Sequence, residues 1–158
     1  MLGVAGGYLQ TGNINGIGVL AGEAEAYLGD VTLAGLLGYQ LSNAPGAQGA
    51  VGRVDVEWYA TEDVMLNIGA ETNPTQAWLV RGGLEYRPGF EALPGLSLFA
   101  EGAFGENNYH RAYVGVRFYF GDADTLKDRH RTNTFRTHLL PTRMTDSAAG
   151  APVPAYGD

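Results

Sequence analysis

Polar and apolar residues alternate with a period of two, and this alternation most constrains how the chain can fold. It is clearest in the stretch VGRVDVEWYA, Val51–Ala60. Successive side chains of an extended strand point to opposite faces. One face of this stretch therefore carries Arg53, Asp55 and Glu57, and the other carries Val54, Val56 and Trp58. The pattern predicts a β-strand with one charged face and one apolar face.

The same alternation recurs along the chain as far as residue 120. It predicts about eight strands, over residues 2–10, 16–28, 31–41, 51–60, 64–72, 78–87, 96–104 and 112–120. Most of these are about 9–12 residues long, as in tilted strands that cross a bilayer, whereas the average strand has about 5–6 residues. The connections are short, as at Gly29-Asp30, and leave no room for a crossover helix. The chain is therefore predicted to form an antiparallel, up-and-down sheet.

One face of the predicted sheet carries almost all of its charges. Acids and arginines are interleaved there: Glu23, Glu25, Arg53, Asp55, Glu57, Glu71, Arg81, Glu85, Arg87, Glu101 and Arg117. No lysine occurs in these strands, although water-exposed faces normally contain many, and small residues such as Gly69 and Gly83 lie among the charges. Small residues suit a narrow lumen filled by a few long side chains. We expect the charged face to point inward as an ion-paired network and the apolar face to meet lipid.

Aromatic residues lie near the strand ends on the apolar face. They include Tyr39, Trp58, Trp78, Tyr86 and Phe104, and Phe118 and Phe120 near the last strand's end. Such residues form girdles at the two interfaces of membrane β-barrels. The predicted fold class is all-β, an antiparallel up-and-down transmembrane β-barrel of about eight strands with a C-terminal extension. The alternative is a soluble β-barrel that uses these aromatics as core and binds a small apolar ligand.

The stretch Tyr113–Phe120, YVGVRFYF, resembles the closing strand of bacterial outer-membrane β-barrels, the porin-like superfamily. In that family a Gly precedes two alternating hydrophobic or aromatic residues, the positions of Gly115, Phe118 and Phe120 here. The resemblance implies a Gram-negative outer membrane, with the lipid bilayer and the barrel-assembly machinery as partners. The family motif normally ends the chain, but residues 121–158 follow it here. Met1 also leads directly into LGVAGG without an export signal, so the alternative is the C-terminal part of a larger porin.

The chain divides into a predicted barrel, residues 1–121, and a C-terminal tail, residues 122–158. Residues 122–131 (DADTLKDRHR) are predicted to form one or two helical turns capped by Asp122 or Asp124. The rest of the tail lacks periodicity and is predicted to be irregular. The mixed-charge residues Leu126, Lys127, Arg129, His130 and Arg131 are expected to bind a periplasmic or envelope partner, or to enter the barrel and pair with its acids.

Charge and composition exclude several classes of function. The net charge is −7 and the only lysine is Lys127, which disfavours nucleic-acid binding. The chain contains no cysteine, so it has no thiolate metal site. No nucleophile motif accompanies His110, His130 or His138, and we expect no enzyme activity, cofactor or metal. The expected role is structural or scaffolding in the cell envelope. The alternative is a narrow cation-preferring channel, because the inward face carries more acids than arginines.

Overall fold

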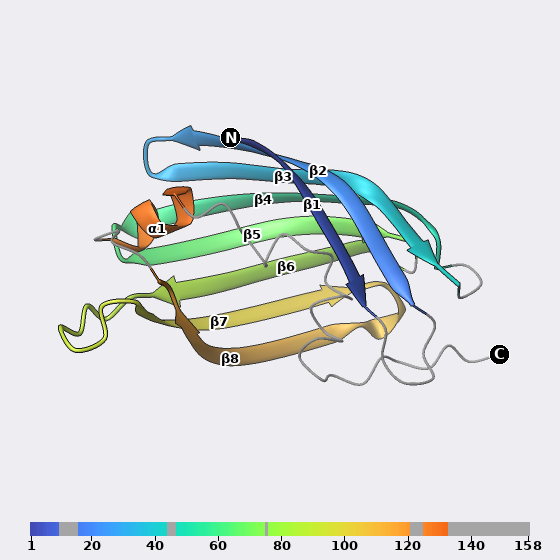
Figure 1. Cartoon of the computed structure of the whole chain (residues 1–158). Coiled ribbons are helices and arrows are strands. Elements are labelled where there is room, and N and C mark those ends of the chain that lie inside the picture. Colours follow the sequence, from blue (N-terminus) through green and yellow to red (C-terminus); the bar gives the residue numbers. More distant parts are fainter. Residues whose placement is uncertain (10–15, 44–46, 75, 121–124, 133–158) are drawn as a thin grey trace.

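A computed structural model describes the chain except for residues 10–15, 44–46, 75, 121–124 and 133–158 (Figure 1). The described elements are eight strands, a short 3-10 helix and an α-helix. They are β1 (Leu2–Leu9), β2 (Ile17–Leu28), β3 (Val31–Ser42), β4 (Gly49–Thr61), β5 (Val64–Asn73), β6 (Gln76–Tyr86), β7 (Leu96–Gly105), η1 (Glu106–Asn108), β8 (His110–Phe118) and α1 (Leu126–Thr132).

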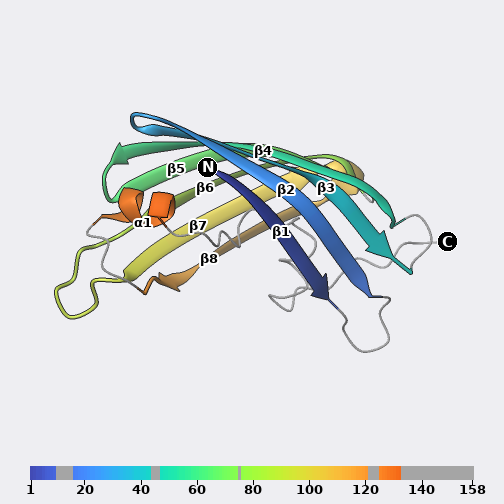
Figure 2. The same cartoon turned by 45° about the horizontal axis from the view of Figure 1, so that its top comes forward.

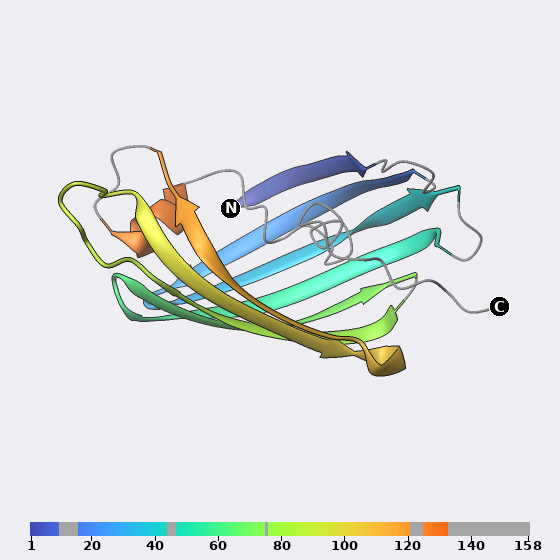
Figure 3. The same cartoon turned by 90° about the horizontal axis from the view of Figure 1, so that it is seen from below.

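The strands form one antiparallel sheet in which spatial order follows sequence order from β1 to β8. Each strand pairs with the next one along the chain, and β2 and β3 are joined by a two-residue turn, where Leu28 pairs with Val31. The prediction of an all-β, up-and-down architecture with eight strands is therefore confirmed. Within the described residues, no pairing joins β8 to β1. The curved sheet thus has two free edges, visible from below in Figure 3.

The element boundaries differ from the sequence expectation by one or two residues at many strand ends, and the differences around β8 and α1 affect the site. Strand β8 ends at Phe118, although the Tyr119 N–H still donates to the Gly95 carbonyl oxygen at 2.9 Å. The loop before β8 contains the 3-10 turn η1. Helix α1 starts at Leu126, and the Thr125 hydroxyl oxygen accepts a hydrogen bond from the Asp128 N–H at 3.1 Å, as an N-cap residue does. The alternative caps Asp122 and Asp124 lie outside the described residues.

The sheet has a buried polar face and an exposed apolar face. We call the face that contains Arg53, Asp55 and Glu57 the inner face, because these three side chains are at most 5 % exposed. The opposite, outer face carries large hydrophobic residues that are mostly exposed, for example Leu37 at 73 % and Ile68 at 61 %. This arrangement inverts the usual distribution of a water-soluble protein, in which apolar residues are buried and charges are exposed.

Helix α1 packs on the inner face at the end of the sheet that carries the β2–β3 and β4–β5 turns (Figures 1 and 2). We call this the α1 end and the opposite one the far end. The Leu126 side chain is fully buried and packs with Tyr59 and Met65. This apolar contact anchors the helix to β4 and β5. Among the described residues, no helix is long and apolar enough to cross a membrane.

The inner face differs between its two sides. On β4–β8 it carries most of the charged residues. On β1–β3 it is made largely of small and apolar residues, and Ile17, Val19, Ala21, Ala34 and Leu36 form a buried cluster with Val51 of β4. The site described below lies mainly on the β4–β8 side and beneath α1.

Candidate functional site: the polar inner face

The centre of the β4–β8 side is an arginine–aspartate group. Arg53 and Asp55 lie two residues apart on β4, so both point inward, and Arg53 Nε donates to Asp55 Oδ2 at 2.6 Å. Arg81 of β6 approaches the other oxygen, with Nε 3.6 Å from Asp55 Oδ1. Asp55 is 1 % exposed, so one buried carboxylate is held between two guanidinium groups. Such pairing is what allows charges to be buried at all.

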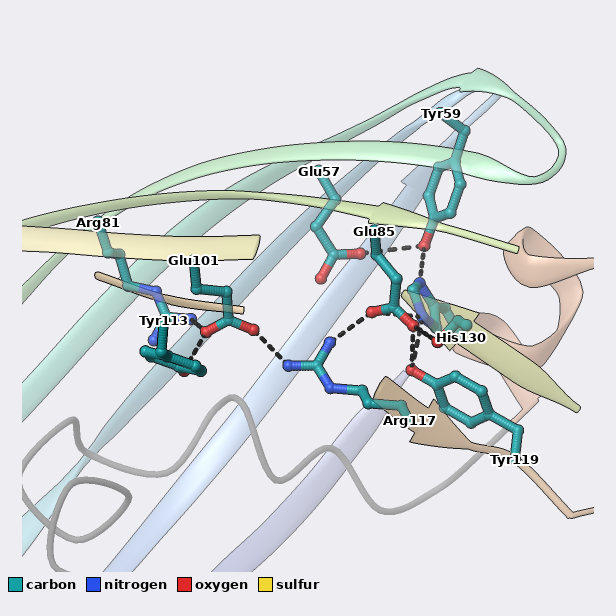
Figure 4. Close-up of polar contacts among 10 residues, drawn as sticks. Glu57, Tyr59, Arg81, Glu85, Glu101, Tyr113, Arg117, Tyr119 and His130 are labelled. Carbon is teal, nitrogen blue, oxygen red and sulfur yellow. Dashed lines mark hydrogen bonds and ion pairs between the residues drawn. The ribbon is translucent and has the colours of Figure 1, made fainter. Parts of the chain in front are cut away.

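A second group is centred on Arg117 of β8 (Figure 4). Its guanidinium donates to Glu85 of β6 and to Glu101 of β7, and it stacks over the Phe99 ring at 4.1 Å. The Tyr113 hydroxyl donates to Glu101 Oε2 at 2.5 Å. Arg81 Nη2 lies 3.7 Å from the same carboxylate oxygen and connects this group to the Asp55 group. The inner face therefore carries one continuous network across β4, β6, β7 and β8.

His130 of α1 joins the helix to this network. Its Nδ1 is 3.0 Å from the Tyr59 hydroxyl and its Nε2 is 3.0 Å from the Tyr119 hydroxyl. The same Nε2 lies 3.6 Å from Glu85 Oε2, and the Tyr119 hydroxyl donates to Glu85 Oε1 at 2.9 Å. Figure 4 shows the imidazole between the two phenol rings and beside the Glu85 carboxylate. A residue from the C-terminal tail thus completes the polar cluster at the α1 end.

The basic residues of α1 hold the turns around it. Lys127 Nζ donates to Asp30 at 2.8 Å in the β2–β3 turn, and Arg131 Nη2 donates to the Gly29 carbonyl oxygen at 2.7 Å in the same turn. On the other side, Arg129 Nη1 donates to the Tyr119 carbonyl oxygen at 3.4 Å. The five tail residues expected to bind a partner, Leu126, Lys127, Arg129, His130 and Arg131, therefore all contact the chain's own sheet. His130 lies beside Glu85 of the inner face and Lys127 pairs with Asp30 of a turn, and binding of an envelope partner stays a prediction.

Two turn carboxylates near α1, Asp63 and Asp30, have lowered pKa values. Burial raises the pKa of Asp63, but hydrogen bonds from Arg87 and the Leu126 N–H, with the charges of Arg87 and Arg129, outweigh it and leave that pKa below its ordinary value. The hydrogen bond and charge of Lys127 lower the pKa of Asp30, although this carboxylate is exposed. Both turns are therefore better partners for α1 while their carboxylates are ionised.

The remaining predicted inner residues are Glu23, Glu25, Glu57, Glu71 and Arg87. Glu25, Glu57 and Glu71 each accept a hydrogen bond from the residue two positions further along the same strand: Tyr27 at 2.5 Å, Tyr59 at 3.2 Å and Asn73 at 3.3 Å, respectively. Glu23 lies over Gly3 of β1. Arg87 pairs with Asp63 of the β4–β5 turn at 2.6 Å, a partner outside the predicted set.

Charge alone does not mark every member of the site. Tyr59, Tyr113 and Tyr119 belong to the network, although the predicted network contained charged residues alone. They share the sequence parity of the charged residues on their strands, and Tyr119 is two residues from Arg117. A search for hydrogen-bonding residues at the charged parity would have found all three. His130 and Asp63 carry no such sequence signal, because neither lies on a strand.

The predicted interfacial aromatics lie on the outer face at two levels. Trp58, Tyr86 and Phe118 lie near the α1 end, and Tyr39, Trp78 and Phe104 lie near the far end. All of them are between 42 % and 57 % exposed. Trp78 and Phe104 meet edge to face, with ring centroids 6.2 Å apart. Of the closing-strand motif, Phe118 and Phe120 are exposed and Gly115 lies on the inner face beneath Phe99.

The inner face is a network of ion pairs and hydrogen bonds. Across the described part of the chain, no group of three or more His, Cys, Asp or Glu residues is arranged to hold a metal ion. Arg81 and Arg117 pair with carboxylates on other strands, which ties β4, β6, β7 and β8 together, whereas Arg53 pairs with Asp55 of its own strand. Comparison of the chain with protein-family models, curated proteins and solved structures finds no match.

Proposed function

We propose that the protein is a small β-barrel of a bacterial outer membrane with a structural or scaffolding role in the cell envelope. One observation carries this proposal: the sheet buries its charges and exposes its large hydrophobic residues. A membrane barrel has this distribution, because lipid surrounds the apolar face and the polar side chains fill the interior. In water the same outer face would be a large apolar surface that favours aggregation.

The aromatic residues support the same placement. Their two levels on the outer face correspond to the two interfaces of a bilayer, where amphipathic rings lie at headgroup depth. The strands between these levels have 8–13 residues, and transmembrane strands need about 9–11. A sheet in lipid must also satisfy the backbone groups of its edges, so the proposal includes closure of the sheet into a barrel.

The inner face favours a structural role over conduction. Asp55, Glu57 and Glu85 are at most 1 % exposed, and their partners fill the space beside them. Helix α1 adds Leu126 and His130 at one mouth. A plugged interior supports the structural candidate more than the narrow cation-preferring channel. A periplasmic partner of residues 126–131 would have to displace α1 from the sheet. The exposed Phe118 and Phe120 remain available as part of a closing strand read by the assembly machinery.

The two tryptophans allow a direct test, because the chain has no others and both lie on the outer face. The protein is refolded into vesicles that contain phospholipids brominated on their acyl chains. We expect the bromolipid to quench the fluorescence of Trp58 and Trp78, and acrylamide in the water to quench it weakly. Trp58→Phe and Trp78→Phe variants assign the signal to each level.

One result would overturn the membrane location, and a different one would overturn the structural role. Strong acrylamide quenching without bromolipid quenching, from protein that stays dispersed without detergent, would support the soluble barrel and overturn the membrane proposal. Bromolipid quenching together with stepwise single-channel currents would keep the membrane location but replace the structural role with the channel. The structural role is supported when quenching occurs and the currents stay at the background of protein-free bilayers.

A further inference from the structure

The two edge strands, β1 and β8, are displaced relative to each other along the strand direction. The strand registers connect residues along a line perpendicular to the strands. Starting from Leu2, this line passes through Ala24, Gly35, Val54, Ala70, Val80, Phe104 and His110. It therefore links the first residue of β1 to the first residue of β8. These two residues lie at opposite ends of the sheet, because β1 starts at the α1 end and β8 starts at the far end.

A closed barrel requires such a stagger, since its strands tilt by about 35–45°. For eight strands spaced about 4.8 Å apart with a rise of about 3.3 Å per residue, a stagger of eight residues corresponds to a tilt of about 35°. A stagger of six corresponds to only about 27°, outside the observed range. A stagger of ten corresponds to about 41° but pairs Leu2 and Gly3 with residues beyond the end of β8.

We infer that β1 and β8 of the same chain pair antiparallel with a stagger of eight residues. Leu2 is then opposite Phe118, which lies eight residues beyond His110, and Val4 is opposite Val116 and Tyr8 opposite Ala112. All of β1 pairs within β8. The stagger is even, so outer residues meet outer residues and inner meet inner. We call this β1–β8 pairing the seam. It rests on the proposed function, which includes closure of the sheet, and adds which strands pair and in which register. The same pairing would form whether lipid or water surrounds the outer face.

Side-chain size across the seam is complementary. In this register the inner residues Gly3 and Gly7 of β1 lie opposite Arg117 and Tyr113 of β8. Arg117 and Tyr113, two long side chains of β8, therefore lie opposite glycines of β1. Glu23 of β2 extends over Gly3, so closure brings its carboxylate towards the Arg117 guanidinium. The seam thus places an acid of the β1–β3 side beside a base of the β4–β8 side.

Helix α1 supports closure within one chain. On one side it is bonded to Tyr119, directly after β8, through Arg129 and His130. On the other side Arg131 bonds to the Gly29 carbonyl oxygen, in the turn that follows β2. A seven-residue helix is only about 10 Å long. The ends of β8 and β2 are therefore held close together at the α1 end, and β1 is the strand that pairs with β2.

Engineered cysteine pairs test the seam, because the chain has no cysteine of its own. The full-length variant Val4→Cys/Val116→Cys is folded in detergent and oxidised. We expect an intrachain disulfide in the majority of molecules, since directly opposite residues have Cα atoms about 4.5–5.5 Å apart. After trypsin digestion the disulfide joins residues 1–53 to residues 112–117. A second pair in the same register, Tyr8→Cys/Ala112→Cys, should give the same result if the first variant folds poorly.

Two controls fix the register. Val4→Cys paired with Val114→Cys or with Phe118→Cys places the thiols two residues out of register, about 7–8 Å apart, and disulfide should be largely lost. Efficient bridging in either control and not in the first pair overturns the stagger of eight. Disulfides between chains overturn closure within one chain in favour of a second copy. Folded variants with no disulfide of either kind show that other strands cover the edges. The tryptophan quenching experiment is independent of all these outcomes, so failure of the seam and failure of the membrane proposal are distinguishable.

Discussion

The two sides of the inner face accommodate their glycines in different ways. On β4–β8, a glycine lies under a large side chain from the neighbouring strand: Asp55 covers Gly69, and the Phe99 ring covers Gly115. On β1–β3, Gly38 instead lies against the Leu20 carbonyl oxygen and the Ala21 side chain. The first arrangement makes room for functional groups, and the second brings two strands of small residues close together. The β4–β8 side is therefore filled mainly by long side chains and much of the β1–β3 side by small ones, with Glu23 over Gly3 as an exception on β1–β3.

The largest effect is expected from breaking the charged side. Asp55→Ala leaves Arg53 and Arg81 buried without the carboxylate that they share, and removing one partner of a buried ion pair costs about 3–5 kcal/mol. Urea unfolding in detergent measures the loss. The exposed acid Glu91 is the matched control, and Glu91→Ala should change the free energy of unfolding by less than about 0.5 kcal/mol. Equal stability of the two variants would mean that the network does not hold the strands together.

The contact between α1 and the sheet comes next in size. Leu126→Ala removes a fully buried side chain from the contact with Tyr59 and Met65, and such substitutions cost about 2–5 kcal/mol. The cost falls on the docking of α1, so trypsin should cut after Lys127 and Arg129 much faster than in the parent protein. The exposed Asp128→Ala is the control, with slow cleavage expected. Fast global unfolding of Leu126→Ala would instead show that α1 is needed by the whole sheet.

The small-residue side is tested by adding one methyl group. In Gly38→Ala the new Cβ meets the backbone of Leu20 and Ala21, which cannot move aside as a flexible side chain can. Overpacking of this kind costs about 1–3 kcal/mol. Gly22→Ala is the matched control on β2, because nothing lies within 4 Å of its added Cβ. Thermal unfolding compares the two. A neutral Gly38→Ala would show that these strands have room to separate.

The strand architecture was predictable from the sequence because the period of two persists through every strand. The alternation over residues 64–72 and 96–104 matches the alternating burial along β5 and β7, since a slip by one residue would have exchanged the two faces. Strand ends were less well predicted. Extended backbone continues for a residue or two on either side of a paired segment, as at Tyr119, and no residue type marks the change.

The position of α1 was not predictable from the sequence. A seven-residue helix has too little intrinsic stability to be specified locally, so its place depends on contacts with distant residues. His130 meets Tyr59 across 71 positions in the chain, and Lys127 meets Asp30 across 97. The residues 122–131 showed only a mixture of charges, which is equally compatible with binding a partner and with docking on the sheet. In the described structure α1 docks on the sheet through both turns, and the binding of a partner stays a prediction.

The smallest expected effect is a loss of α1 docking at low pH, because two turn carboxylates that contact α1 become protonated. In the β4–β5 turn burial raises the pKa of Asp63, but hydrogen bonds from Arg87 and from the Leu126 N–H of α1 outweigh it and lower that pKa. In the β2–β3 turn Lys127 of α1 lowers the pKa of Asp30. A carboxyl whose pKa is lower in the folded protein stabilises it fully above its unfolded value of about 3.9. That stabilisation is lost as the pH falls through the folded pKa, when the group becomes protonated. Docking of α1 should therefore weaken as the pH falls below about 4.

The two turns should differ in their contributions. Asp63 accepts hydrogen bonds from Arg87 and from the Leu126 N–H and is partly buried, whereas Asp30 is exposed and screened by water. Hydrogen exchange of the α1 amides, corrected for the intrinsic effect of pH, reports release of the helix. We expect Asp63→Asn to weaken docking near neutral pH and to reduce its acid dependence, and Asp30→Asn to do so much less. Glu85 also faces α1 through His130, but it is unchanged in both variants and contributes equally. Equal effects of the two substitutions would mean that α1 is held by the exposed turn as firmly as by the partly buried one, and that the β4–β8 side does not dominate its docking.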